Sequence, residues 1–235
     1  MKLAIMQPYL FPYIGYWQLL NAADKFVAFD DVAFIKRGHI NRNRILINGA
    51  AYLFTAPVQS ASQNRLIMDT KLRFDEKERA KFLLRIENSY KRAGQFGAVM
   101  PFLEKIIWRQ TEDLTELILF SLQEVMAYLG IKTELLRSSE IDKDPSLKAQ
   151  DRILEICRRL DADTYINPSG GRALYQSEAF ARQGMKLFFL DTRFDKVKYR
   201  QFQEEFVENL SILDILMFNE VEQIKRFLEE YDLNG

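Results

Sequence analysis

The chain has few of the residue types on which common catalytic and structural sites depend, because its 235 residues include only one cysteine and one histidine. A single cysteine, Cys157, excludes an internal disulfide, and its place in the apolar periodicity of a predicted helix indicates a buried structural thiol. A single histidine, His39, excludes a histidine-rich metal site and leaves a Ser-His-Asp triad no other histidine to use. No partner for His39 is visible in the sequence, so we expect a surface or packing role for it.

An excess charge of one sign and a long apolar run are also missing. The 33 basic residues balance the 33 acidic ones, which gives a net charge of zero at pH 7. This balance gives no reason to expect nucleic acid or an acidic membrane surface as a partner. No signal peptide is recognisable, and no apolar run reaches the roughly 20 residues that a membrane span needs. We therefore expect a cytoplasmic protein without a membrane span.

The sequence begins with alternating strand and helix patterns. Residues 2–6 form a short apolar run, and residues 14–23 carry apolar side chains at helical spacing. The next stretch, "KFVAFDD", reads as a second strand that ends in Asp30 and Asp31. A strand, a helix and a strand in so short a segment predict a right-handed βαβ unit and hence a parallel sheet.

The pattern changes near residue 40. The stretch "NRNRILINGAAYLFTAPV" places Asn48-Gly49 between two β-rich runs, which predicts a hairpin with a type I′ turn. Residues 76–129 read as helical, and the breaks at Ala93-Gly94 and at Pro101 predict about three helices there. We expect this hairpin and these helices, at about 40–130, to form an insertion that covers the sheet or extends from it.

Strand and helix patterns alternate again in the remainder of the chain. Strands are predicted at "TELLRSS", "TYIN" and "KLFFLD", with a helix at 147–160 and a loop and helix at "PSGGRALYQSEAFARQG". Two more helices are predicted at 212–217 and 221–231. The expected fold is a single α/β domain over residues 1–235, with a mainly parallel, Rossmann-like sheet of about five strands.

The loop after the first strand, "QPYLFPYIGYW", is crowded with aromatic residues, two prolines and a glycine. In open α/β sheets, ligands bind outside the carboxyl ends of the strands. We expect Trp17 to be core and the other polar and aromatic groups to face a pocket: Gln7, Tyr9, Tyr13 and Tyr16, with Gly15 admitting the ligand. The Pro-x-x-Gly-aromatic pattern stands where nucleotidyltransferases of the HIGH-motif superfamily have a Pro-x-His-x-Gly-His turn. A relation to that fold is one interpretation, but tyrosines at the histidine positions argue against shared chemistry.

A second cluster of candidate binding residues is "NPSGGRALY". Two glycines before a helix let backbone N–H groups approach an anion at the positive end of the helix dipole. Arg172 would add a bidentate contact to a phosphate or carboxylate. The alternative is a tight turn capped by Ser169. The predicted binding residues here are Asn167, Ser169, Gly170, Gly171, Arg172 and Tyr175.

A third cluster, "DDVAFIKRGHINRNR", combines two carboxylates with several cations. Asp30 or Asp31 is the candidate general base, and the arginines would clamp a diphosphate. The predicted binding residues are Lys36, Asn41, Arg42 and Arg44. The alternative is a solvated loop with salt-bridged charges. A metal site would require Asp30, Asp31 and Asp191 to converge, and none is expected. All three clusters should meet at one edge of the sheet.

Four ordered segments together resemble the WbqC-like family of bacterial proteins: "MQPYLFPYIGYWQLLNAADKFVAFDDV", the later "NRNRI", "YINPSGGRALY" and "LSILDILMFN". They extend from the first residues to about Asn219. Members are often encoded among genes for O-antigen and other surface polysaccharides, and transfer of glycine or a similar acyl group to an amino sugar is the suggested activity. One departure is His39, whose position is usually aromatic. The resemblance implies an acyl or aminoacyl transferase whose partners are a nucleotide-linked amino sugar and an acyl donor, with no cofactor specified.

Two other functions remain open at this point. The first is a nucleotidyl-transfer or acyl-adenylate-forming enzyme, which follows from the place of the opening loop. The second is a non-catalytic binding protein of a polysaccharide assembly complex. It gains support because no standard catalytic dyad or triad can be built from these residues.

Overall fold

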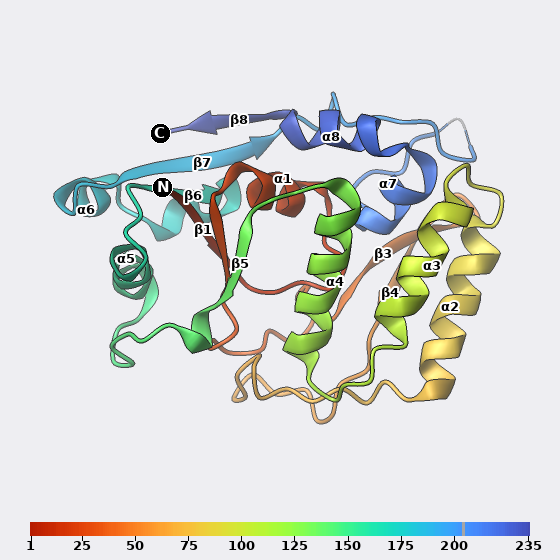
Figure 1. Ribbon diagram of the computed structural model, residues 1–235, viewed down its shortest axis with the longest axis horizontal. Helices are drawn as coiled ribbons and strands as arrows, with labels where there is room; N and C mark the ends of the chain where they lie inside the picture. Colours follow the sequence, from red (N-terminus) through yellow and green to blue (C-terminus); the bar gives the residue numbers. More distant parts are fainter. Residues whose placement is uncertain (204) are drawn as a thin grey trace.

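A six-stranded sheet forms the centre of the computed structural model, which describes residues 1–203 and 205–235 (Figure 1). Its strands are β1 (Lys2–Met6), β2 (Lys25–Ala28), β5 (Glu134–Arg137), β6 (Thr164–Pro168), β7 (Lys186–Thr192) and β8 (Tyr231–Asn234). They lie in the order β5-β2-β1-β6-β7-β8, and all neighbours are parallel except β7 and β8. The prediction of an α/β fold with a mainly parallel sheet is confirmed.

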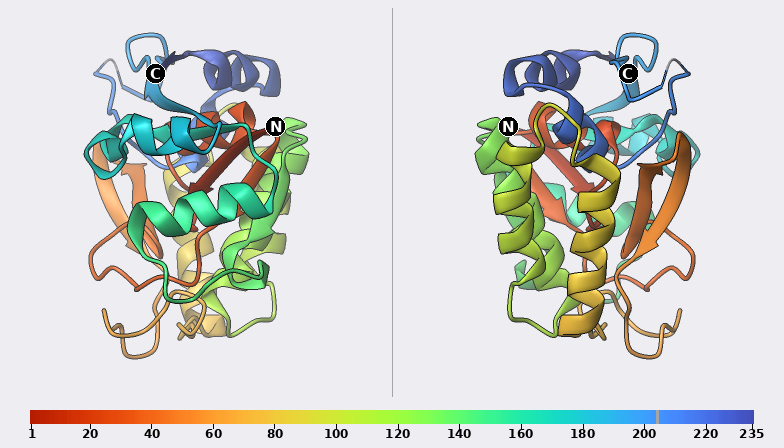
Figure 2. Two further views of the ribbon diagram at one scale, coloured as in Figure 1. Left: turned by 90° about the vertical axis from the view of Figure 1, so that its left-hand side faces the viewer. Right: turned by 90° about the vertical axis from the view of Figure 1, so that its right-hand side faces the viewer.

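The central strands β1, β2, β6 and β7 are mostly apolar and buried, as is typical of parallel strands covered on both faces. Leu3 and Ile5 of β1 belong to one core cluster, together with residues of α5 (Ala149–Arg159) and α6 (Ser177–Arg182). Ala4 belongs to the other cluster, with α1 (Ile14–Ala22) and most of the remaining helices. Figure 2 (left) shows α5 lying across one face of the sheet.

The chain between β2 and β5 forms a hairpin and three helices. The antiparallel strands β3 (Arg42–Ile47) and β4 (Ala50–Thr55) are separate from the main sheet. Asn48 and Gly49 between them have φ angles of 49° and 77°, as a type I′ turn requires, so the hairpin prediction is confirmed. The helices that follow are α2 (Glu76–Tyr90), α3 (Phe96–Ile107) and α4 (Leu114–Leu129).

Two predicted element boundaries are wrong. Pro101 lies inside α3, and the break between the last two of these helices comes after Ile107. Pro101 has no N–H to donate to the Gly97 carbonyl, one helical turn earlier. Both residues are exposed, so water can bond that carbonyl instead, and the helix tolerates the proline. At the end of the chain, α8 (Val221–Glu229) is shorter than expected, and β8 follows it as an unpredicted strand.

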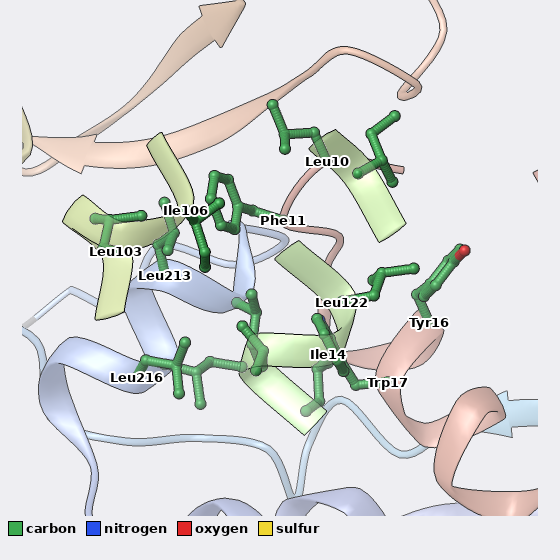
Figure 3. Packing of buried hydrophobic residues seen from close by; sticks show 14 of the residues in the cluster. Leu10, Phe11, Ile14, Tyr16, Trp17, Leu103, Ile106, Leu122, Leu213 and Leu216 are labelled. Carbon is green, nitrogen blue, oxygen red and sulfur yellow. The ribbon is translucent and has the colours of Figure 1, made fainter. Parts of the chain in front are cut away.

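The opening loop contributes to the larger core cluster as well as to the sheet edge. Leu10 and Phe11 are almost completely buried among side chains of α3, α4 and α7 (Ile212–Phe218), and Figure 3 shows this packing. Phe11 has a positive φ of 47°, and its carbonyl oxygen accepts hydrogen bonds from Asn43 Nδ2 at 2.8 Å and Ser211 Oγ at 2.7 Å. These bonds and the apolar packing hold the loop in one conformation.

Candidate functional site

A cleft of about 520 Å³ lies at the carboxyl ends of β1 and β6. The chain runs outward from β1 to β2 and β5, then returns to β6 on the other side of β1, so this is the point where the strand order reverses. Ligands of open α/β sheets bind at such a point. Two of the three predicted clusters meet here: the cleft is lined by Gln7, Tyr9, Tyr13 and Gly15 from the first and by Asn167, Ser169, Gly170, Gly171 and Tyr175 from the second.

The opening loop supplies one wall of the cleft. The Tyr9 hydroxyl lies 3.5 Å from Gln7 Oε1, at the limit of a hydrogen bond. Burial, with a smaller effect from Tyr13, raises the pKa of Tyr9 to about 12, and burial also raises the pKa of Tyr13. Both hydroxyls are therefore neutral at pH 7 and can donate as well as accept hydrogen bonds.

Gly15 is needed for the packing of this wall. A β-carbon at Gly15 would come within 2.6 Å of the Tyr13 ring and 2.8 Å of Thr192 Oγ1. The space next to Gly15 is thus filled by protein atoms. Gly15 does line the cleft, and a close approach of a ligand to its backbone stays a prediction.

The loop after β6 supplies the facing wall. Asn167 Oδ1 accepts a hydrogen bond from the Tyr165 hydroxyl at 3.1 Å, and Asn167 Nδ2 donates to the Pro168 carbonyl at 3.1 Å. A β-carbon on Gly171 would lie 1.9 Å from Asn167 Nδ2, whereas the space around Gly170 is open. Gly171 therefore allows the Asn167 amide to occupy its position in the cleft.

The predicted anion site at a helix N-terminus is not formed. Residues Ser169–Leu174 form a 3-10 helix of 6 residues, and α6 begins only at Ser177. Arg172 is not among the residues that line the cleft: it donates to Asp191 at 2.7 Å and lies 4.9 Å from the centre of the Phe189 ring. Among the residues that the structure describes, those that line the cleft include no charged side chain.

Tyr16 belongs to the core, contrary to the prediction that it faces the pocket. Its ring is fully buried 5.2 Å from that of Phe26, and its hydroxyl donates to the Gln7 carbonyl at 3.1 Å. The cause is that α1 is buried from Ile14 to Leu20 and so has no solvent-facing side there. Trp17 is core, as predicted, and its Nε1 donates to the Pro12 carbonyl at 3.1 Å.

The candidate general bases do not line the cleft. Asp30 is fully buried and accepts hydrogen bonds from Arg137 Nε at 3.1 Å and from the backbone N–H and hydroxyl of Ser139 at 2.9 and 2.8 Å. Asp31 pairs with Lys143 at 2.8 Å and Arg152 at 2.5 Å. Both carboxylates are thus engaged in structural interactions.

The Asp31 ion pairs connect to the cleft through Arg152, which packs against the cleft residue Phe29. Burial disfavours the Asp31 carboxylate, but the hydrogen bond from Lys143 and the charge of Arg152 outweigh this effect and lower its pKa. The Arg152 guanidinium lies 5.3 Å from the centre of the Phe29 ring, and Phe29 lines the cleft. Asp31 therefore stabilises a cation that packs against the back of one cleft wall.

The remaining residues of the third cluster also lie outside the cleft lining. Lys36 is exposed, and Arg44 is exposed on β3. Asn41 Nδ2 donates to the Ala56 carbonyl at 2.8 Å, and Arg42 Nε donates to the Gly38 carbonyl at 2.8 Å. These contacts fit the alternative interpretation of this segment, a structural loop and hairpin.

The loop of the third cluster reaches the site at His39. The His39 ring centre lies 5.9 Å from that of Tyr9, which does line the cleft. Burial lowers the pKa of His39, and the charges of Arg42 and Arg44 lower it further. The imidazole is therefore mainly neutral at pH 7, and the residue is exposed.

Several residues that line the cleft were not predicted from the sequence. Thr192 and Phe194 come from the end of β7 and the residues after it, and Ile153 comes from α5. Thr192 Oγ1 donates to Gln18 Oε1 at 2.7 Å. The signal that could have found Thr192 and Phe194 is their place directly after the predicted strand "KLFFLD", since carboxyl ends of parallel strands share one edge.

The described residues contain neither a candidate metal site nor a candidate membrane span. No group of three histidine, cysteine, aspartate or glutamate side chains is placed to hold a metal ion within residues 1–203 and 205–235. No helix in the same part of the chain is long and apolar enough to cross a membrane.

Comparison with known proteins identifies the family. The model of the WbqC-like protein family matches residues 7–226. An uncharacterized protein of Mycobacterium tuberculosis is 28% identical over 219 residues, which cover 92% of each chain. No solved structure matches significantly. Because the family model extends over nearly the whole sequence, the chain belongs to the WbqC-like protein family.

Proposed function

We propose that the protein is a cytoplasmic transferase of surface-polysaccharide biosynthesis, which moves glycine or a similar acyl group onto the amine of a nucleotide-linked amino sugar. The observation that carries this proposal is the chemistry of the cleft, which combines aromatic rings with amides and hydroxyls and has no charged side chain among its described lining residues. Membership of the WbqC-like family supports the same conclusion through the function that the family resemblance implies.

The cleft suits the sugar part of such a substrate. The rings of Tyr9, Tyr13 and Tyr175 offer apolar faces on which a sugar ring can stack. Gln7 and Asn167 offer amide groups for the sugar hydroxyls. A diphosphate has no cation to pair with in this lining, so we place the sugar in the cleft and the phosphates outside it.

Acyl transfer in this site would depend on positioning. The amine nitrogen attacks the acyl carbon of an activated ester or thioester, the new C–N bond forms, and the C–O or C–S bond breaks. The proton of the amine leaves with the alcohol or thiol. The Tyr9 and Tyr13 hydroxyls, neutral at pH 7, would donate hydrogen bonds to the acyl oxygen as negative charge develops there.

A non-catalytic binding protein of a polysaccharide assembly complex is the second candidate, and one observation favours it. Within the described part of the chain, the cleft lining has no carboxylate, lysine or histidine that could act as a general base. A nucleotidyl transfer reaction draws support from the Rossmann-like order of the parallel strands. Among its described residues, the cleft lining has no charged side chain to stabilise a triphosphate.

Ligand binding separates these functions. We expect a nucleotide-linked amino sugar to raise the melting temperature. At a ligand concentration one hundred times the dissociation constant, binding adds about 2.7 kcal/mol to the free energy of unfolding. The free amino sugar should have a smaller effect. Mass spectrometry of the sugar after incubation with an activated glycyl donor then tests transfer. Binding without any acylated product would favour the binding protein, and stabilisation by neither compound would contradict both.

A pair of neighbouring glycines gives a matched test of the cleft. Gly171→Ala should weaken amino-sugar binding by about tenfold or more, because its β-carbon displaces the Asn167 amide. Gly170→Ala adds the same atom in open space and should bind normally. Isothermal titration calorimetry of the two variants makes the comparison. Equal affinities in both would place the sugar away from Asn167.

A further inference from the structure

A second groove, of about 630 Å³, lies between α2 and the turn of the β3–β4 hairpin. Its lining comes from Leu46–Gly49 of the hairpin, from one side of α2, from Arg92 just after that helix and from residues 202–203. It shares no lining residue with the cleft at β1 and β6. Figure 2 (right) shows α2 on the side of the molecule where this groove is found.

The groove is basic. Lys81 and Arg85 lie on one side of α2, one helical turn apart, and Arg92 follows shortly after the helix ends. No aspartate or glutamate is among its described lining residues, and none of the three cations forms an ion pair within residues 1–203 and 205–235. Three positive charges in one concave surface, none of them paired with an acidic side chain of the described residues, attract an anion.

Aromatic rings hold the two arginines in place. The Arg85 guanidinium lies 5.1 Å from the centre of the Tyr52 ring, and that of Arg92 lies 5.4 Å from the centre of the Phe202 ring. A guanidinium stacked on a ring keeps the N–H donors at its edge available for a second partner. Such an arrangement reduces the entropy that is lost when an anion binds.

We propose that this groove binds the phosphate groups of a nucleoside di- or triphosphate. Its volume lies in the range typical of small-molecule sites. Arginine side chains bind phosphate oxygens through two parallel hydrogen bonds, and Leu84 and Phe202, which are 57% and 38% exposed, give an apolar surface for the base. A nucleic acid fits less well, because a net charge of zero provides no long-range attraction for a polyanion. This proposal does not depend on the function proposed for the cleft.

Calorimetric titration with ADP, UDP and inorganic pyrophosphate tests the groove. The wild-type protein should bind all three, and adenosine, which has no phosphate, should bind much more weakly. Arg85→Gln combined with Arg92→Gln should weaken nucleotide binding by about tenfold or more. Lys77→Gln removes one positive charge from an exposed position of α2 outside the groove, as the single variant Lys81→Gln does within it, and should leave affinity unchanged.

Two further variants keep the test decisive. If the double arginine variant is not folded, the single variant Lys81→Gln, at an exposed position, should still weaken pyrophosphate binding. Gly171→Ala in the cleft should leave nucleotide binding intact. The proposal is overturned if no phosphate compound binds, if the groove variants bind as the wild type does, or if a single-stranded oligonucleotide binds more tightly than the nucleotides at the same salt concentration.

Discussion

Trp17→Ala is expected to lower the free energy of unfolding by roughly 3–5 kcal/mol, whereas Tyr16→Phe should lower it by about 1 kcal/mol. Trp17 is fully buried in the larger core cluster, and its loss leaves a cavity that the surrounding helices cannot fill (Figure 3). Its removal also leaves the Pro12 carbonyl without the bond from Nε1. Tyr16→Phe keeps the ring and removes only the hydrogen bond to the Gln7 carbonyl.

Urea denaturation followed by circular dichroism measures both changes. The second tryptophan, Trp108, provides a matched control because it is 40% exposed at the end of α3, and Trp108→Ala should cost about 1 kcal/mol or less. Tyr16→Phe should bind amino sugars nearly as the wild type does, since its hydroxyl is turned to the backbone. A Trp17→Ala variant as stable as Trp108→Ala would show that the packing of α1 is not as described.

The parts of the fold that depend on local patterns could be predicted. The five parallel strands and the Asn48-Gly49 turn could be predicted because each depends on residues that are close in sequence. The strand β8 could not be predicted, because its four residues become a strand only by pairing with the edge of β7. The helix break predicted at Pro101 was wrong, because a proline is tolerated in a helix where it and the carbonyl one turn earlier are exposed, and this exposure cannot be deduced from the sequence.

The candidate site was predictable to the extent that strand ends determine it. The loops after β1 and β6 meet because parallel strands place their carboxyl ends at one edge. The partners of charged side chains were not predictable. Asp30 bonds to Arg137 and Ser139, more than a hundred residues away, and Arg172 bonds to Asp191. These interactions remove from the cleft the charges that the sequence suggested for it.

The opening loop illustrates why one short segment carries both core and site residues. Its backbone turns at Phe11, so that Leu10 and Phe11 enter the core while Gln7, Tyr9 and Tyr13 line the cleft. Because the buried residues fix the loop, the cleft residues are held in place before a ligand arrives. A preorganised wall of this kind lowers the entropic cost of binding.

Asp31→Asn is expected to lower the free energy of unfolding at pH 7 by about 3 kcal/mol, the lower end of the cost of breaking a buried ion pair. The substitution keeps the shape of the side chain but leaves Lys143 and Arg152 without the negative charge. Their side chains are only 6% and 18% exposed, so water compensates little. Lys143→Met in the Asp31→Asn background should recover part of the loss, because it removes one of the unpaired cations.

The pH dependence of the same variant gives an independent test. The folded protein holds the pKa of Asp31 below its ordinary value of 3.8, so the charged form stabilises the fold. This contribution is fully present above the unfolded pKa and is lost as the pH falls through the folded pKa. The difference in unfolding free energy between wild type and Asp31→Asn should therefore be largest near pH 7 and shrink below about pH 4.

Urea titrations at several pH values between neutral and acid measure this difference. Asp195→Asn serves as the control, because its side chain is 72% exposed and lies 3.9 Å from Lys196, so its effect should stay within about 0.5 kcal/mol at every pH. A constant difference between wild type and Asp31→Asn across the acid range would mean that the variant acts through packing. If the difference in unfolding free energy disappears as the pH falls, the stabilisation comes from the charge of Asp31. It then acts through the ion pairs with Lys143 and with Arg152, the cation that packs against Phe29 in the cleft.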